Sequence, residues 1–369
     1  MNTLQKLSLS GFKSIKQVDG LEFGPLNVLI GANGSGKSNL ISFFQMLNYA
    51  MTGGLRQFVA VQGGASSLLH FGPKRTSRIS AEITFKTFGG TNTYAAQLTH
   101  AAGDTLIFVD EEVSFQRDDR TAPQRIPMGV GHQETKLNDP LLKAEGTVGF
   151  VRGLLTATRV YQFHDTSSES RMRLPARISD NRWLFSDGGN LPALLYRLQQ
   201  REPHAYERIV SIIRQAAPFF HDFALEPDLL NPNIIELRWM EKGAPEPMGP
   251  HQLSDGTLRF TALTTLLCLP PQEIPRLLII DEPELGLHPS AVVLFAEIVS
   301  TLRDVAQVFV STQSVTLLNR MAPEDVLVAE RVEDGGSIYR RLDAQGLAGW
   351  LEDYGMGELW EKNVLGGRP

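Results

Sequence analysis

Cysteine is almost absent from the sequence: Cys268 is the only one among 369 residues. No disulfide can form within the chain, which excludes the disulfide-stapled class of secreted domains and favours a reducing cytosol. Long apolar runs are missing as well. Proline interrupts the longest of them, around Leu266, within about ten residues, whereas a membrane span needs ~18. We therefore expect a cytoplasmic protein that does not enter a membrane.

Basic residues are also fewer than acidic ones. The chain has 35 lysines and arginines against 41 acidic residues, a formal net charge of −6. No global positive field attracts the molecule to nucleic acid or to anionic lipid, so any such contact needs a local basic patch. Hydrophobic residues make up 42% and charged residues 21% of the chain, which is ordinary for a globular protein with a sizeable buried core.

Heptad repeats are absent too, so no long coiled coil is expected. Two other patterns are present. Residues 3–10 and 78–117 alternate between apolar and polar positions, which predicts strands of an antiparallel meander. Residues 52–73 and 118–150 are weakly patterned, and we expect loops there. From residue 276 to 330 apolar strands alternate with helical segments, which is typical of a parallel sheet with crossover helices.

The segment GANGSGKS, residues 31–38, matches G-x-x-x-x-G-K-[ST] between a predicted strand and a predicted helix, the context that a phosphate loop requires. Its glycines let successive backbone N–H groups point at phosphate oxygens, and the dipole of the next helix adds to the attraction. Lys37 would reach the β- and γ-phosphates, and Ser38 would bind Mg²⁺. The predicted nucleotide-binding residues of the loop are Gly31, Ala32, Asn33, Gly34, Ser35, Gly36, Lys37, Ser38 and Asn39.

An acidic pair follows the apolar strand in RLLIIDEPELGLHP, residues 276–289. The strand brings Asp281 to its carboxyl end, where ligands bind in open α/β sheets. We predict that Asp281 holds Mg²⁺ and that Glu282 polarises the attacking water. Glu284 either faces solvent or lies behind this pair. A turn without catalytic function is the alternative, which the upstream phosphate loop disfavours.

The segment LSDGTLRF, residues 253–260, resembles the Leu-Ser-Gly-Gly-Gln signature that begins a helix in ABC-type ATPases. Together with GANGSGKSN, DEPELGLHP and the opening LSLSGFKSI, it makes the chain similar to the RecF-, SMC- and OLD-like branch of these ATPases, over residues 7 to about 319. The resemblance implies an Mg²⁺-dependent ATPase with an ABC-ATPase head. It also implies a homodimer in which ATP on one phosphate loop is capped by the signature helix of the other chain.

The signature would thus bind the partner's nucleotide through four residues, Ser254, Asp255, Gly256 and Thr257. A helix N-terminus with free N–H groups is suited to a γ-phosphate. Asp255 departs from the family pattern, which has glycine at this position, and a carboxylate pointing inward would repel phosphate. Aspartate tolerates unusual backbone angles and caps helices, so we expect it to point away.

Two glutamines complete the predicted site. Gln162 follows the predicted strand TRVY and is a candidate for the family's glutamine loop, which contacts magnesium and water; a surface glutamine would look the same in sequence. Gln313 ends the strand QVFVST, where most ABC ATPases have a histidine at the γ-phosphate. Glutamine can donate a hydrogen bond but cannot become cationic. We therefore expect slow hydrolysis without a histidine-like pH limb, the alternative being a helix cap.

The fold class that we predict is α/β, an ABC-ATPase head with an antiparallel β lobe, a parallel-sheet core bearing the phosphate loop, and a helical insert. We place the N-terminal lobe in residues 1–160, the insert in 161–250, the signature, acidic strand and switch region in 251–330, and a C-terminal cap in 331–369. Packing on the head is favoured over partner docking for the large apolar residues of the cap, which are Trp350, Tyr354, Leu359 and Trp360.

The insert carries a cluster of arginines, Arg171, Arg173, Arg177 and Arg182. Such a cluster could grip a DNA backbone or an acidic partner. A solvated loop with internal ion pairs is favoured, and the same holds for the basic group Lys74, Arg75 and Arg78.

The resemblance implies that the dimer controls a DNA-related process in antiphage defence, with a nuclease effector on a separate polypeptide. About fifty residues follow Asn319, which we expect to be too few for the TOPRIM nuclease domain of OLD-type proteins. A stand-alone RecF-like repair ATPase that binds DNA is the alternative, and a steep salt dependence would favour it. Membrane fractionation would test a transporter motor, and single-turnover hydrolysis a non-hydrolysing scaffold.

Overall fold

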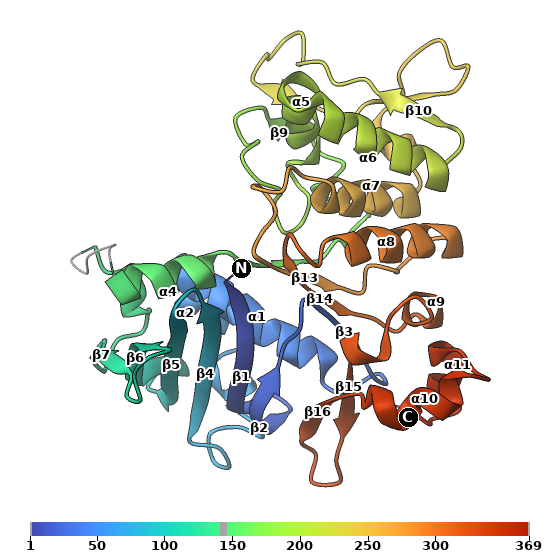
Figure 1. The fold of residues 1–369 in the computed structure, drawn as a ribbon. Helices are drawn as coiled ribbons and strands as arrows, with labels where there is room; N and C mark the ends of the chain where they lie inside the picture. The colour runs from blue at the N-terminus through green and yellow to red at the C-terminus, as the bar shows by residue number, and fades with distance from the viewer. Residues whose placement is uncertain (1, 141–145, 368–369) are drawn as a thin grey trace.

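The computed structural model describes residues 2–140 and 146–367 and contains two six-stranded sheets (Figure 1). The first sheet is antiparallel and has the strand order β2-β1-β4-β5-β6-β7. Its strands are β1 (Thr3–Phe12), β2 (Ile15–Glu22), β4 (Arg78–Thr87), β5 (Gly90–Ala101), β6 (Thr105–Arg117) and β7 (Gln124–Pro127). The alternating burial along β4 and β5 is that of a sheet with one face toward a core.

The second sheet has the order β16-β15-β3-β14-β13-β8. Its strands are β3 (Leu26–Ile30), β8 (Thr158–Tyr161), β13 (Leu277–Asp281), β14 (Gln307–Ser311), β15 (Val326–Arg331) and β16 (Ser337–Arg341). All neighbours pair in parallel except β15 and β16, which form an antiparallel hairpin at one edge. The central strands β3, β13 and β14 are buried at every position, as expected for parallel strands covered on both faces.

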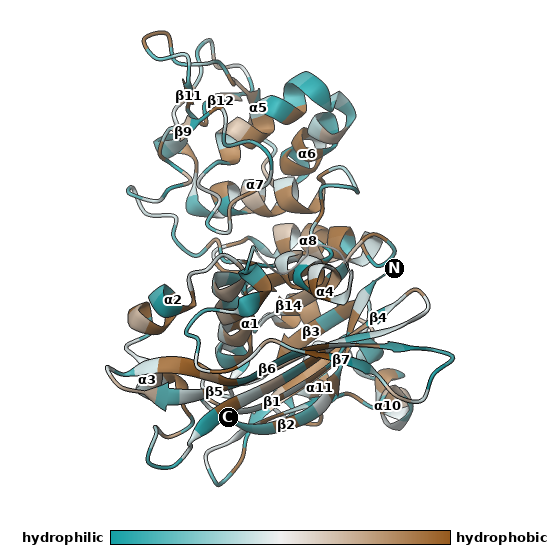
Figure 2. Ribbon diagram, turned by 90° about the vertical axis from the view of Figure 1, so that its left-hand side faces the viewer, coloured by the Kyte–Doolittle hydropathy of each residue, from teal (hydrophilic) through white to brown (hydrophobic). Residues whose placement is uncertain are grey.

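Each face of this sheet packs on its own hydrophobic core. On β3, Leu26, Val28 and Ile30 belong to the core shared with the helical lobe, whereas Leu29 belongs to the core shared with the antiparallel sheet. Phe309 of β14 likewise points toward the second core. In Figure 2 hydrophobic colour concentrates between the layers. The alternation follows from the two-residue period of a strand.

Helices cover the two sheets in separate groups (Figure 1). Beside the antiparallel sheet lie α1 (Lys37–Met51), α2 (Leu55–Val61), α3 (Ala65–Leu68) and α4 (Gly146–Thr156). The helical lobe contains α5 (Leu191–Arg201), α6 (Pro203–Ala216), α7 (Asp255–Leu267) and α8 (Pro289–Thr301). Two small antiparallel pairs accompany it, β9 (Ala176–Arg177) with β11 (Ile234–Ile235) and β10 (Phe220–Phe223) with β12 (Trp239–Glu241).

The C-terminal part of the chain lies against the parallel sheet and α8 (Figure 1). It includes α9 (Val315–Leu318), α10 (Ala344–Leu351) and α11 (Met356–Glu361). Three 3₁₀ turns connect elements, at Lys136–Asn138, Pro250–Gln252 and Pro323–Asp325. Of the large apolar residues in the predicted cap, Leu359 is fully buried, Tyr354 and Trp360 are partly buried, and Trp350 is exposed and contacts the ring of Tyr354.

The predicted fold class is confirmed: an antiparallel lobe, a mostly parallel sheet and a helical insert. Two predicted loops are wrong in part. Residues 52–73 contain α2 and α3, and residues 118–150 contain β7, a 3₁₀ turn and the start of α4. These elements are short, and their residues are buried through contacts with the neighbouring sheet. The local pattern of apolar and polar residues does not predict such contacts. In the described ranges no helix is long and apolar enough to cross a membrane.

Candidate nucleotide-binding site

The phosphate loop connects the carboxyl end of β3 to the first turn of α1. Gly34 and Gly36 have positive φ angles of 79° and 111°, a region that other residues enter only with strain. A Cβ atom on Gly31 would clash with the backbone oxygen of Ala329, and one on Gly36 with Ser337 Oγ. Glycine at these two positions is therefore required by close neighbours as well as by torsion.

Lys37 is buried at the start of α1. Its Nζ donates hydrogen bonds to the backbone oxygens of Gly31, at 2.6 Å, and Ala32, at 3.1 Å. Burial lowers the pKa of Lys37, while the nearby carboxylates of Glu282, Asp281 and Glu284 oppose that shift. The side chain thus bends back over its own loop, with acidic groups of the neighbouring strand within electrostatic range.

Asp281 ends β13 with its side chain buried. Its Oδ2 accepts a hydrogen bond of 2.8 Å from Gln162 Nε2, and Gln162 Oε1 accepts one of the same length from Gln45 on α1. Gln162 therefore lies directly against the predicted metal ligand. Burial raises the pKa of Asp281, because taking a carboxylate out of water penalises its charged form.

Glu282 has φ = 45°, one of few non-glycine residues with a positive φ in the described chain. Such a conformation costs about 1–3 kcal/mol and occurs preferentially at functional sites. Its backbone N–H donates to Ser311 O at 2.9 Å, and its Oε1 accepts from Gln313 Nε2 at 2.6 Å. The Gln313 side chain therefore holds the Glu282 carboxylate.

Glu284 also contacts the end of β14. Its Oε1 accepts a hydrogen bond of 2.7 Å from the backbone N–H of Gln313, and burial raises its pKa. Of its two predicted placements, solvent-facing or behind the acidic pair, the second agrees with these contacts. Gln313 is thus bound at its backbone by Glu284 and donates through its side chain to Glu282.

The residues at these strand ends fit a magnesium–nucleotide complex. Ser35 Oγ is buried without a hydrogen-bond partner in the described part of the chain. Ser311 Oγ and one oxygen of Asp281 are buried near each other, and neither forms a well-aligned hydrogen bond there. Buried polar atoms are normally satisfied, so these three suit a ligand with several polar atoms. Ser38 is exposed on α1, where its hydroxyl is free to bind a cation.

The β15–β16 hairpin supports the phosphate loop from behind, which the sequence analysis did not foresee. Tyr339 donates its hydroxyl proton to Gly36 O at 2.8 Å. Ser337 and Asn39 both donate to Ser14 Oγ, at 2.7 and 2.6 Å. The Asn39 side chain therefore contacts the turn between β1 and β2, while its backbone N–H donates to Gly36 O of the loop at 3.0 Å. Nothing in the local sequence marks Tyr339 and Ser337, which lie about three hundred positions from the loop.

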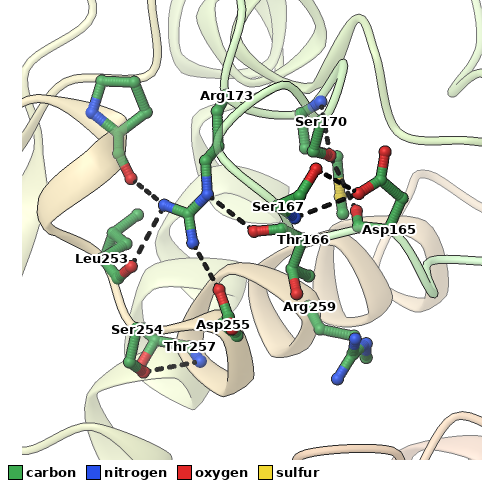
Figure 3. Close-up of polar contacts among 12 residues, drawn as sticks. Asp165, Thr166, Ser167, Ser170, Arg173, Leu253, Ser254, Asp255, Thr257 and Arg259 are labelled. Carbon is green, nitrogen blue, oxygen red and sulfur yellow. Dashed lines mark hydrogen bonds and ion pairs between the residues drawn. The ribbon is translucent and has the colours of Figure 1, made fainter.

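The signature turn begins α7. Ser254 is its N-cap, and its Oγ accepts a hydrogen bond of 3.1 Å from the backbone N–H of Thr257. Asp255 points the other way, toward Arg173, with Oδ1 2.7 Å from a guanidinium nitrogen (Figure 3). This geometry agrees with the expectation that the Asp255 carboxylate points away from the phosphate side, and the Arg173 guanidinium group neutralises its charge.

Arg173 uses its remaining donors on backbone oxygens. It donates to Thr166 O at 2.9 Å, to Leu253 O at 3.1 Å and to Pro250 O (Figure 3). Its side chain is 5% exposed. It therefore connects the segment after Gln162 to the turn that precedes the signature helix.

Arg259, one turn into α7, is a second buried arginine that sequence reasoning missed. It donates to Phe163 O at 2.7 Å, to His164 O at 3.0 Å and to Leu285 O. Gly256 packs so closely on the same region that a Cβ there would clash with Gly286 O. The signature helix is thus joined to both the glutamine segment and the loop after Glu282.

The structure brings the predicted residues together in two groups. Lys37, Asp281, Glu282, Gln313 and Gln162 gather at the carboxyl ends of β3, β8, β13 and β14. Residues 254–257 form no hydrogen bond or ion pair with residues 31–39 in the described chain, and Ser254 and Asp255 are exposed. One chain therefore contains two separate halves of the predicted site.

The arginine cluster, for which internal ion pairs are favoured over a DNA or partner contact, does not lie as a unit on the surface. Arg173 is buried on the signature turn, and Arg171 forms an ion pair with Asp187 at 3.0 Å. Arg171, Arg177 and Arg182 are exposed, and neither Arg177 nor Arg182 forms an ion pair in the described part of the chain. The favoured alternative, internal ion pairs, accounts for the first two, because residues close in sequence point in different directions from an irregular loop.

This geometry, a phosphate loop beside an acidic strand end and a separate signature helix, defines a P-loop ATPase of the ABC/RecF/SMC type. Residues 26–319 match the family described as "AAA domain, putative AbiEii toxin, Type IV TA system". The match spans roughly four-fifths of the chain, and the protein belongs to that family.

Solved structures show the same fold. One is the Smc head bound to the C-terminal winged-helix domain of ScpA, with a TM-score of 0.57 and 17% identity, covering 94% of this chain and 99% of that one. Another is the Pyrococcus furiosus Smc head with an extended coiled coil, bound to the C-terminal domain of ScpA, with a TM-score of 0.58 and 16% identity, covering 96% and 99%. No curated protein matches the chain. The likeness is one of fold.

Proposed function

We propose that the protein is a Mg²⁺-dependent ATPase whose two heads close on ATP in a head-to-tail dimer. The observation that carries this proposal is the convergence of Lys37, Asp281 and Glu282 at the carboxyl end of one parallel sheet, next to a glycine-shaped phosphate loop. Strand ends of this kind bind ligands in open α/β sheets. The three buried oxygens at this edge support a polar ligand there.

The residues divide the chemistry as follows. The loop's N–H groups and Lys37 bind the β- and γ-phosphates, Ser38 and Asp281 hold Mg²⁺, and Gln162 orients the Asp281 carboxylate. Glu282 takes a proton from the attacking water. Gln313, by donating to Glu282 Oε1, fixes the direction of that carboxylate and leaves its other oxygen for water.

Dimerisation follows from the separation of the two halves. Ser254 is exposed and Gly256 and Thr257 are half-buried at a helix start that forms no hydrogen bond or ion pair with residues 31–39 in the described chain, and a helix start attracts phosphate. Arg173 neutralises Asp255, which would otherwise repel the γ-phosphate of a partner's ATP. The signature therefore acts on the nucleotide of a second copy.

For the biological role we propose control of a DNA-related process in antiphage defence, with a nuclease effector on a separate polypeptide. Support comes from the family description, which places related sequences in a toxin–antitoxin system, and from the resemblance to the OLD-like branch. Copurification with a protein trapped in its ATP-bound form would identify the effector.

The test is Glu282→Gln. General-base removal lowers rates by about 10²–10⁴-fold, so single-turnover hydrolysis should fall by at least ~100-fold while ATP binding persists. Glutamine keeps the size of the side chain and an acceptor for Gln313, so the ATP-bound dimer should accumulate in sedimentation velocity. Glu297→Gln, an exposed position on α8, is the control. A Glu282→Gln protein that hydrolyses normally, or stays monomeric with ATP, contradicts the proposal.

A further inference from the structure

A second cavity lies at the amino end of the parallel sheet, opposite to the predicted nucleotide site. Its volume is about 940 Å³, and its lining includes residues next to the first residues of β8 and β13, together with one face of α4 and the end of α5. Asp281 and Gln162 lie at the other ends of these same strands. The cavity is within the size range of ligand sites, and none of its lining residues belongs to the nucleotide site.

Arginine dominates this lining. Five arginines line the cavity, Arg152, Arg159, Arg182, Arg197 and Arg201, against a single carboxylate, Glu273. Glu273 is fully engaged by Arg197 through two hydrogen bonds. The other four arginines have no carboxylate partner in the described part of the chain. In a protein of net charge −6, this is a concentrated local excess of positive charge.

Trp183 holds two of these arginines in place without neutralising them. The guanidinium carbon of Arg159 is 5.1 Å from the Trp183 ring centroid and that of Arg182 is 5.4 Å away. An aromatic ring attracts a cation within ~6 Å but removes none of its charge and does not exhaust its donors. Both guanidinium groups are therefore positioned in advance to accept an anion.

Helix α4 keeps the cavity open with glycine. Gly149, Arg152, Gly153 and Thr156 line it at spacings of three and four residues, which places them on one helix face. A glycine inside a helix costs about 1 kcal/mol relative to alanine. A Cβ on Gly153 would meet no atom within 4 Å, so packing within the chain does not require glycine there, and the helix face toward the cavity is open at this position.

We propose that this arginine cavity, lined by Arg152, Arg159, Arg182 and Arg201 around Trp183, binds phosphate groups carried by a nucleic-acid strand or by a free polyphosphate. The planar guanidinium fork matches phosphate oxygens with two parallel hydrogen bonds. Among the described residues that line the cavity, Glu273 is the only carboxylate, and Arg197 engages it. The inference does not depend on ATP hydrolysis at the other end of the sheet.

The test measures binding of fluorescein-labelled (dT)20 by anisotropy between 50 and 200 mM salt, for the full chain and for Arg152→Gln/Arg201→Gln. Both arginines are exposed and unpaired, so the variant should fold. We expect at least a ~10-fold loss of affinity, and a salt slope smaller by about 1.4, because each lost single-strand phosphate contact removes about 0.7. Arg152→Lys/Arg201→Lys should recover much of the affinity.

The matched control is Lys74→Gln/Arg75→Gln, which removes the same charge from another exposed position and should leave (dT)20 binding unchanged. A second arm titrates inorganic tripolyphosphate calorimetrically in a Lys37→Ala background, which disables the phosphate loop. Loss of (dT)20 binding in the arginine variant identifies a nucleic-acid strand as the source of phosphate. Loss of tripolyphosphate binding alone identifies a free polyphosphate.

The proposal is overturned if neither probe binds the full chain at 50 mM salt. It is equally overturned if the arginine variant and the lysine–arginine control lose affinity to the same extent. In that case the binding reports net charge and not this cavity.

Discussion

The phosphate loop and the signature turn are both helix starts, yet their surroundings differ. Lys37 is buried and bonded to its own loop, and the Gly36 carbonyl is held by Tyr339. Ser254 and Asp255 are exposed, and Arg173 and Arg259 anchor the signature helix from behind. A helix start enclosed by its own chain can hold a ligand alone. An exposed one needs a second surface opposite to it.

In the proposed dimer, this difference would keep the two halves of the shared site separate within one chain. Arg173 and Arg259 connect the signature helix to the glutamine segment and to the loop after Glu282.

Lys37→Ala should abolish nucleotide binding by the enclosed helix start, the phosphate loop. Loss of the cation that reaches the β- and γ-phosphates is expected to weaken ATP binding by at least ~100-fold, measured by calorimetry in the presence of Mg²⁺. Lys16→Ala, at an exposed lysine paired with Asp334, is the control and should bind ATP normally. Unchanged affinity in Lys37→Ala would rule out the phosphate-loop assignment.

Ser254→Arg should disable only the exposed helix start, the signature turn. The monomer should still bind ATP, but hydrolysis should fall by ~10-fold or more because the long side chain obstructs the partner's phosphates. Mixing it with Lys37→Ala should restore activity, since a mixed dimer contains one composite site with an intact loop and an intact signature. Ser254→Thr, which keeps the helix cap, is the control. A mixture without recovered activity would argue against action in trans.

Asp281→Asn should stabilise the nucleotide-free protein while abolishing Mg²⁺-dependent hydrolysis. Burial raises the pKa of Asp281 in the folded state, so its stabilising effect is present below its unfolded pKa and is lost as the pH rises through the folded value. At pH 7 the variant's Tm should therefore be ~1–3 °C higher, and the difference should vanish near pH 4. A variant that is less stable at pH 7 would contradict this sign.

Tyr339→Phe should give the smallest effect. Removal of one hydrogen bond to Gly36 O costs about 0.5–1.5 kcal/mol, so ATP affinity should fall by about 2- to 13-fold, with a slightly lower Tm. Tyr206→Phe, which loses a hydrogen bond to Asp222 in the helical lobe, serves as the control. If both variants weaken ATP binding equally, the hairpin has no special role in shaping the loop.

Elements with a strong local pattern were predicted well. The alternating strands β4, β5 and β6 and the apolar strands β3, β13 and β14 lie where their periods placed them. Weakly patterned stretches were not, and the start of α4 was taken for loop because the three glycines of this helix depress the helical signal. Two of them, Gly149 and Gly153, line the arginine cavity.

The sequence by itself determined the phosphate loop and the acidic strand end, because consecutive glycines, a lysine and an apolar strand act through torsions and contacts within a few residues. Only the tertiary structure decided what surrounds them. Arg173 meets Asp255 across 82 positions, and Tyr339 meets Gly36 across 303. Such pairs depend on how whole helices and sheets pack. No local spacing in the sequence therefore identifies these pairs. In the same way, the arginines that line the cavity are brought together only by the packing of α4, β8 and α5.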